Sequence, residues 1–232
     1  MTRRSAQVLV FDADDTLWEN NVRFERVIED FLDWVEHPTR DRAAIRTVLD
    51  DVEAANSVAH GYGAKVFLRS LAECFERLAA RPATAAERRR IDELASALHG
   101  HRVDLVPGVS ETLAELGTRH DLLLLTKGDP DEQHGKLEAS GLRHHFGGGV
   151  HVVPEKDAAT YRRLAQDLAL PLTRTWMVGN SPRSDVLPAR AAGMSAVLIP
   201  NDNTWVLEHS EIDPHDPGVL TLRSFPELLT HF

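Results

Sequence analysis

Five short apolar segments, each bounded by polar or turn-forming residues, constrain the fold of this chain more than any other feature. They lie at residues 8–11, 122–125, 150–153, 176–178 and 196–199. Short apolar segments of this kind are typical of parallel strands that are covered on both faces. From the second onward they alternate with helical patterns, so we expect an α/β fold built on a parallel sheet with right-handed crossovers.

Three of the helical patterns are followed by a glycine, at Gly117, Gly141 and Gly193, where a left-handed residue commonly ends a helix. The chain beyond Asn201 is rich in Asp, His and Pro, and this composition predicts a loop before a final short helix over residues 225–229. Asn203-Thr204-Trp205 in that loop either borders the site or forms a surface turn.

The first connection is unusual, because about a hundred residues separate the first apolar segment from the second, far more than a crossover needs. Apolar residues recur at helical spacing in four stretches between residues 22 and 99. The last stretch begins with a capping box, Thr84 with Glu87 three residues later, and closes at Gly100. The pattern predicts a small helical bundle inserted after the first strand.

Composition limits the possible partners and compartments. The 232 residues carry a net charge of −10, which argues against nucleic acid or an anionic membrane surface as the main partner. No apolar run approaches the ~20 residues of a membrane-spanning helix, and the residues after Arg3-Arg4 are too few for a signal-peptide core. The single cysteine, Cys74, excludes an intramolecular disulfide and lies in a helical pattern that predicts burial. We expect a cytoplasmic protein.

Carboxylates follow the first apolar segment directly, as Asp12-Ala13-Asp14-Asp15-Thr16. Residues two apart in extended chain point to the same side, so Asp12 and Asp14 should converge at the carboxyl end of the strand, where open α/β sheets bind ligands. Asp15 reads as a turn residue.

Polar residues also follow the next two apolar segments. Thr126-Lys127-Gly128 comes after the second, and a Thr hydroxyl with the following backbone N–H groups can hold a phosphoryl oxygen. Lys156, one of four lysines in the chain, comes just past the third. A Thr or a Lys after a single strand more often has a structural role, so the functional interpretation depends on such residues following several strands in succession.

The fourth apolar segment runs into Gly179-Asn180-Ser181-Pro182-Arg183-Ser184-Asp185. Asn180 and Asp185 offer oxygen atoms five residues apart, and oxygen ligands suit Mg²⁺. The structural alternative is a loop in which Ser184 or Asp185 caps the next helix.

Together these pieces resemble the haloacid dehalogenase superfamily over nearly the whole chain. The matching residues are Asp12-x-Asp14-x-Thr16, Thr126, Lys156, and Gly179-Asn180 with Asp185. The resemblance implies a Rossmann-like core formed by residues 1–17 and 101–232, and an α-helical cap over residues 18–100. It further implies that Asp12 attacks phosphorus, that Asp14 is the general acid and base, and that Thr126 and Lys156 bind the transferring phosphoryl group.

The expected activity is therefore a Mg²⁺-dependent phosphatase acting on a small phosphorylated metabolite through an aspartyl phosphate on Asp12. The expected metal site comprises Asp12, Asp14, Asn180 and Asp185. Asn180 replaces the first acidic residue of the usual metal motif and should weaken metal binding. Asp14 disfavours a 2-haloacid dehalogenase, since the dehalogenases of this superfamily lack a carboxylate there. A phosphotransferase and a catalytically weak binding or regulatory protein remain alternatives.

Further residues are candidates for substrate binding. In the core these are Thr16, Lys127 and Gly128. In the cap, Tyr62 lies between two glycines with Lys65 nearby, and it either contacts the substrate or packs inward as part of a helix-helix turn. Trp18 either lines the mouth of the site or anchors the cap.

Overall fold

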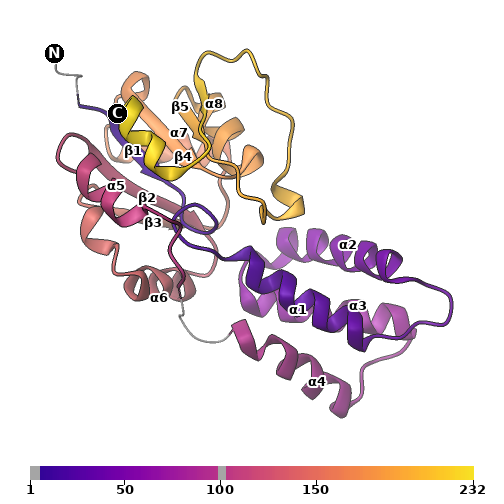
Figure 1. Cartoon of the computed structure of the whole chain (residues 1–232). Coiled ribbons are helices and arrows are strands. Elements are labelled where there is room, and N and C mark those ends of the chain that lie inside the picture. Colours follow the sequence, from indigo (N-terminus) through magenta and orange to yellow (C-terminus); the bar gives the residue numbers. More distant parts are fainter. Residues whose placement is uncertain (1–5, 99–102) are drawn as a thin grey trace. The chain divides into compact units, whose positions relative to one another are not determined.

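The computed structural model describes residues 6–98 and 103–232, and these divide into two compact units, 6–21 with 103–232 and 22–98. Figure 1 shows the strands and helices of both. The first unit contains a sheet of six parallel strands in the order β3-β2-β1-β4-β5-β6. The strands are β1 Val8–Phe11, β2 Asp121–Lys127, β3 Val150–Val153, β4 Thr175–Gly179, β5 Ser195–Leu198 and β6 Val219–Thr221.

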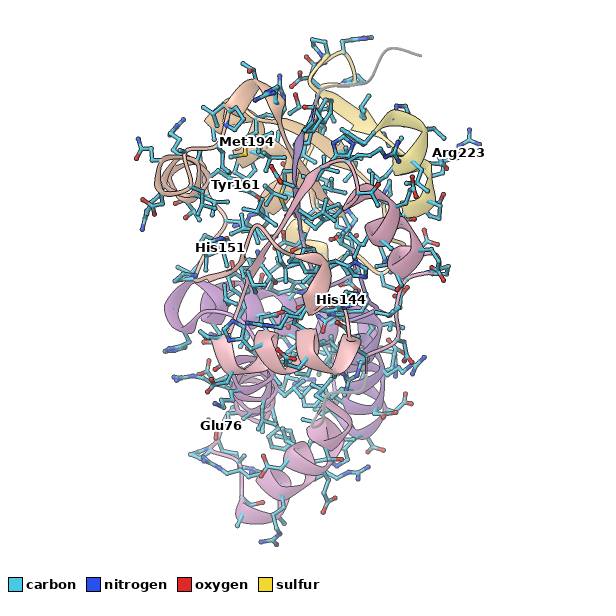
Figure 2. The ribbon with its side chains drawn as sticks, turned by 90° about the vertical axis from the view of Figure 1, so that its left-hand side faces the viewer. Glu76, His144, His151, Tyr161, Met194 and Arg223 are labelled. Atoms are coloured by element: carbon cyan, nitrogen blue, oxygen red, sulfur yellow. The ribbon has the colours of Figure 1, made fainter. Side chains whose placement is uncertain are left out.

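Helices cover both faces of this sheet, as the apolar character of its strands requires. They are α5 Val109–Leu116, α6 Pro130–Ser140, α7 Ala158–Asp167, α8 Leu187–Ala192 and α9 Leu228–His231. Leu9 and Phe11 of β1 pack with apolar residues of α5, α6 and α9. Val8 and Val10, which point to the opposite face, pack with residues of α7 and α8. Figure 2 shows Tyr161 and Met194 within this second layer.

The five predicted strands and the α/β class are confirmed. The prediction of a loop after Asn201 is wrong in one respect, because Val219–Thr221 forms the edge strand β6 beside β5. Gly141 and Gly193 end α6 and α8 in the left-handed conformation, but Gly117 follows α5 with a right-handed φ of −63°. The helical bonding continues through Gly117, whose N–H reaches the carbonyl of Leu113, so this end does not need a left-handed residue.

The second unit is a helical bundle, as the sequence predicts. Its helices are α1 Asn21–Trp34, which begins at the boundary, α2 Arg42–His60, α3 Ala64–Ala79 and α4 Ala85–Ala95, followed by a 3-10 turn, Ser96–Leu98. Both hydrogen bonds of the capping box between Thr84 and Glu87 are present. Cys74 is fully buried in the apolar core of this bundle. The predicted helix end at Gly100 lies outside the described residues.

Among the helices of the described residues, none is long and apolar enough to cross a membrane.

Candidate active site

The residues singled out in the core lie at the carboxyl ends of four neighbouring strands, β3, β2, β1 and β4. Asp12 follows β1 directly, and its N–H donates to the carbonyl of Val178 in β4 at 2.9 Å, so the sheet pairing extends to the first candidate residue. Parallel strands bring all their carboxyl ends to one edge, which is why residues more than a hundred positions apart in the sequence meet here.

A buried lysine joins two buried carboxylates at the centre of this edge. The Lys156 ammonium donates to Asp12 Oδ1 and, at 2.8 Å, to Asp185 Oδ1. Burial alone would lower the pKa of Lys156, but the charges of Asp12 and Asp185 raise it above its ordinary value. When both carboxylates are ionised, two negative charges against one ammonium give this triad a net charge of −1.

Burial also changes the acidity of Asp12, which is 8% exposed. Desolvation, with a smaller contribution from the charge of Asp185, raises the pKa of Asp12 to about 7 although Lys156 acts in the opposite direction. Lys156 alone therefore does not hold Asp12 fully ionised at neutral pH. A second positive charge next to Asp12 would lower its pKa and favour the ionised carboxylate.

Thr16 and Asn180 border the second oxygen of Asp12. The Thr16 hydroxyl lies 3.0 Å from Asp12 Oδ2 and 3.1 Å from Asn180 Oδ1, and its single proton is shared between these two acceptors. The amide nitrogen of Asn180 points the other way and donates to the Thr204 hydroxyl at 2.9 Å. Asn180 thus presents its carbonyl oxygen on the side of Asp12.

The loop after β4 is built around Gly179 and Asp185. A Cβ atom at position 179 would lie 2.1 Å from Asp185 Oδ2, so only glycine permits this approach. The Ser181 N–H donates to Asp185 Oδ2 at 3.0 Å, while the Ser181 hydroxyl accepts from the N–H of Ser184 and caps the π-helical turn Pro182–Val186. The cap is therefore Ser181, and the sequence-based alternative of Ser184 or Asp185 in that role is wrong.

Asp14 binds a different cation from Asp12. Its carboxylate accepts from Lys136 at 3.0 and 3.1 Å, from Gln133 at 2.8 Å and from the Trp18 indole at 2.8 Å. Burial alone would raise the pKa of Asp14, but the Lys136 charge and the three donors lower it below its ordinary value. Asp14 is close enough to Asp12 for its charge to contribute to the raised pKa there. The two carboxylates share the site but not their partners.

Trp18 is 1% exposed and belongs to the apolar core of this unit, so it does not line an open mouth. Its indole N–H donates to Asp14, a contact that the sequence did not indicate.

Thr126 and Lys127 are the last two residues of β2, and their side chains have different hydrogen-bond partners. Thr126 is buried, and no residue of the described ranges forms a hydrogen bond with its hydroxyl, which leaves this group available. The Lys127 ammonium, by contrast, lies 2.5 Å from Glu208 and 2.8 Å from the Ser184 hydroxyl. This pairing neutralises the positive charge expected to attract substrate. Gly128 adopts a φ of +137°, and its N–H donates to the carbonyl of Val153.

Asp15 is structural, as the sequence indicates. It has a positive φ of 60°, and its carboxylate accepts from the N–H groups of Asn20 and Asn21 at the start of α1. Burial raises its pKa to about 7, and these two N–H groups offset part of the rise.

Tyr62 and Lys65 belong to the helical unit, with Tyr62 in the turn between α2 and α3 and Lys65 in the first turn of α3. Gly61 and Gly63 flank Tyr62 with positive φ values of 82° and 119°. The assignment of these residues to substrate binding stays a prediction.

Three site residues escaped the sequence analysis: Gln133, Lys136 and Glu208. For Lys136 a signal existed in the sequence, because the chain has only four lysines. Gln133 lies in the helical pattern that ends at Gly141, which does not single out one polar residue, and Glu208 lies in the stretch beyond Asn201, for which the sequence predicts a loop.

The donor set fits a hard divalent cation. Two carboxylates, Asp12 and Asp185, and the amide oxygen of Asn180 gather around one edge of the sheet, and Mg²⁺ takes few protein oxygens and keeps several waters. Within the described ranges, no three His, Cys, Asp or Glu side chains form a group that could hold a metal ion. Asp14 is bound to Lys136, so its predicted place among the metal ligands has no support from its side chain.

A family model for haloacid dehalogenase-like hydrolases matches residues 6–193. A phosphoserine phosphatase from Thermus thermophilus is 29% identical over 229 residues, covering 83% of this chain and 88% of that protein.

Solved structures are similar over almost the full length. A haloacid dehalogenase-like family hydrolase from Xanthomonas campestris has a TM-score of 0.79 and 28% identity, covering 98% of this chain and 96% of that one. A hydrolase from Bacillus subtilis bound to magnesium has a TM-score of 0.69 and 18% identity, covering 98% of this chain and 99% of that one. The L-2-haloacid dehalogenase from Xanthobacter autotrophicus has a TM-score of 0.63 and 18% identity, covering 96% of this chain and 96% of that one. The last two show the fold alone.

Proposed function

Because the chain belongs to the haloacid dehalogenase-like hydrolases, we propose that it is a Mg²⁺-dependent phosphatase that acts on a small phosphate monoester. The observation that carries this proposal is the pair of carboxylates at the end of β1. Asp12 is held by Lys156, and Asp14, two residues later, is held separately by Lys136. One carboxylate is thereby available as nucleophile and the other for proton transfer.

The proposed reaction has two steps. An Asp12 oxygen attacks phosphorus, the bond from phosphorus to the ester oxygen breaks, and Asp14 donates a proton to that oxygen. Asp14 then takes a proton from the water that attacks the aspartyl phosphate, which releases inorganic phosphate and restores Asp12. Thr126 and Lys156 hold the phosphoryl oxygens during both steps.

Charge explains why a metal is part of the proposal. Asp12 has to be ionised to attack phosphorus, and with both carboxylates ionised Asp12, Asp185 and Lys156 together carry −1, which repels a phosphate dianion. Mg²⁺ neutralises that negative charge when it is bound. Asp12, Asp185 and the amide oxygen of Asn180 would hold it.

The surroundings of Asp14 favour some substrates over others at the first step. Its three donors keep it ionised at neutral pH, which is the form needed to accept a proton from water. Before the first step it has to take up a proton, unless the leaving group needs none. Aryl phosphates, whose leaving oxygen is a weak base, are therefore the most sensitive test substrates.

The test is hydrolysis of an aryl phosphate with and without Mg²⁺ by the wild type and by Asp12→Asn. We expect turnover that requires Mg²⁺ and that falls by at least 1,000-fold, on the order of the loss of a nucleophile, in the variant. Turnover unchanged in Asp12→Asn would overturn the mechanism. Halide release from a 2-haloacid without phosphatase activity would identify a dehalogenase instead.

We propose a substrate class that is narrower than the fold alone implies. The similarity to the Thermus thermophilus phosphoserine phosphatase makes O-phosphoserine the first compound of a phosphate panel. Tyr62 and Lys65 of the helical unit are the proposed specificity residues. We also propose that the enzyme is cytoplasmic, because a chain with one cysteine forms no intramolecular disulfide and needs no oxidising compartment.

A further inference from the structure

A largely buried ion pair between Lys127 and Glu208 lies beside the candidate active site. The Lys127 ammonium is 2.5 Å from Glu208 Oε1, and the two side chains are only 15% and 12% exposed. Lys127 directly follows Thr126 at the end of β2, and its ammonium also donates to the Ser184 hydroxyl at 2.8 Å. Ser184 directly precedes Asp185. The pair therefore adjoins both a proposed phosphoryl-binding residue and a proposed metal ligand.

Glu208 keeps its negative charge in this position. Besides Lys127, it binds the Ser181 hydroxyl, which donates to Glu208 Oε2 at 2.5 Å. Burial alone would raise the pKa of Glu208, but the charge of Lys127 and the hydrogen bonds from Lys127, Ser181 and Ser184 lower it below its ordinary value. Glu208 is therefore ionised at neutral pH and neutralises the charge of Lys127.

This pair changes the net charge that a ligand meets in the site. When Asp12 and Asp185 are ionised, these carboxylates and Lys156 together carry −1, and the neutral pair adds nothing to that sum. Without the charge of Glu208, Lys127 would change the sum from −1 to 0, and the site would attract a cation less and a phosphate more. Glu155 also approaches Lys127, at 3.7 Å, but its side chain is 49% exposed, so water weakens its effect.

We propose that Glu208 is a specificity-determining residue that neutralises Lys127 and thereby sets the balance between the affinity of the site for a divalent cation and its affinity for phosphate. The inference rests on the proposed phosphatase function and deepens it, because it assigns control of product affinity to a residue outside the strand-end motifs. With Lys127 neutralised, inorganic phosphate is attracted by fewer cations and leaves the site more readily.

The test measures two ligands without substrate: Mn²⁺, by electron paramagnetic resonance, and inorganic phosphate, by calorimetry with saturating Mg²⁺ and without it. Glu208→Gln removes the charge and keeps the size of the side chain and its capacity for hydrogen bonds. We expect this variant to bind Mn²⁺ more weakly and phosphate more tightly, each by about 5-fold, the order of effect of one unit charge in a partly buried site.

Two further variants show whether the effect depends on Lys127. The double variant Glu208→Gln with Lys127→Met removes both charges of the pair, so it should bind both ligands with about the wild-type affinities. Glu211→Gln, which removes a carboxylate at an exposed position three residues further along, is the matched control for the loss of one negative charge. Thermal unfolding of every variant is measured alongside.

The opposite signs of the two effects separate a change of charge from a loss of structure. Weaker binding of both ligands by Glu208→Gln, or no change in either, would overturn the inference, as would a double variant that behaves like Glu208→Gln. A wild type that binds phosphate but no divalent cation would overturn the proposed metal dependence, while the phosphate titrations would still test Glu208. If Glu208→Gln does not fold, Lys127→Met is the reverse test, with tighter Mn²⁺ binding and weaker phosphate binding expected.

Discussion

Gly179 shows how closely the backbone and one carboxylate approach each other in this site. A methyl group there would lie 2.1 Å from Asp185 Oδ2 and 2.4 Å from its Cγ, so Asp185 would have to move. Asp185 is also one of the two carboxylates bound by Lys156. Displacing it therefore disturbs the lysine that is proposed to hold the phosphoryl group.

We expect Gly179→Ala to lower kcat/KM by about 100-fold, the effect of shifting a reacting group by about an ångström. Steady-state kinetics and a Mg²⁺ titration measure the change. Gly147→Ala is the matched control, because a Cβ there meets no atom within 4 Å. Equal activity of the two variants would show that the close approach at Gly179 does not matter for the reaction.

Lys136 determines the charge state of Asp14. Its ammonium, itself 6% exposed, lowers the pKa of Asp14 against the opposing effect of burial. Lys136→Met removes this charge, so the pKa of Asp14 should rise. The limb of the pH–rate profile that reports Asp14 should then move to higher pH by about one unit or more.

Lys136→Arg keeps the positive charge and serves as the control for that experiment. Breaking a buried ion pair costs about 3 to 5 kcal/mol of stability, so thermal unfolding of each variant has to be measured alongside. A loss of rate in Lys136→Met without a shift of either limb would mean that Lys136 supports the fold and not the acidity of Asp14.

At the scale of elements, helix α6 explains why two side chains reach Asp14 together. It begins with Asp129 as N-cap and Pro130 in the first turn, both favourable at a helix start. Gln133 and Lys136 lie three residues apart and therefore share one face of the helix. That face is turned toward the carboxyl end of β1, where both donate to Asp14. The helix after β2 thus contributes to the site as directly as the strand ends do.

Helix α2 of the inserted bundle carries a buried carboxyl group that makes the stability of this unit depend on pH. Glu53 is 8% exposed, and its Oε2 atom has no hydrogen-bond partner among the described residues. Burial raises its pKa from 4.5 to about 8, although the charge of Arg46 opposes the rise. The folded bundle holds this proton more tightly than the unfolded chain does. The contribution of Glu53 to the free energy of unfolding therefore falls as the pH rises from about 4.5 to about 8. Above pH 8 this contribution no longer changes.

We expect Glu53→Gln to remove this dependence. At pH 8 the variant should be more stable than the wild type, by about 2 to 5 kcal/mol on the basis of the pKa difference, and near pH 5 the two should be close. Thermal unfolding at several pH values measures the difference. Asp92→Asn, which removes a carboxylate at an exposed position of α4, is the matched control. A constant difference at all pH values would show that Glu53 does not titrate in this window.

For the whole molecule, the parallel sheet and the inserted helices were predictable because each rests on a local pattern. Short apolar segments identify β1 to β5, and helical spacing of apolar residues identifies the bundle. The edge strand β6 was missed because it is three residues long, with no room for a period, and follows a stretch rich in Asp, His and Pro.

In the candidate site, only the residues that directly follow the ends of the strands were predictable from the sequence. Asp12, Asp185 and Lys156 meet because the parallel strands β1, β4 and β3 end at the same edge of the sheet. Two other ion pairs could not be predicted in this way: Lys136 with Asp14, 122 residues apart, and Lys127 with Glu208, 81 residues apart. They depend on the directions of the side chains and on the path of the C-terminal segment, for which the sequence has no periodic signal. These pairs decide which lysines remain to bind an anion.

Charge also acts on the whole molecule. With a net charge of −10 and with Lys127, Lys136 and Lys156 each bound to carboxylates, the protein offers a phosphate little attraction at long range. Attack of one anion on another therefore depends on neutralisation within the site, by Lys156 and by the proposed Mg²⁺. The central claim is that Asp12 becomes phosphorylated there.

Acid quench of the enzyme during turnover of an aryl phosphate, followed by peptide mapping with mass spectrometry, tests that claim most directly. Asp14→Asn should make the intermediate accumulate, since hydrolysis of the aspartyl phosphate is proposed to need Asp14 as base. We expect a phosphoryl group on the peptide that carries Asp12, present with Mg²⁺ and absent in Asp12→Asn. Release of the aryl alcohol in the first turnover with no phosphoryl group on that peptide, or with one on another residue, would contradict it.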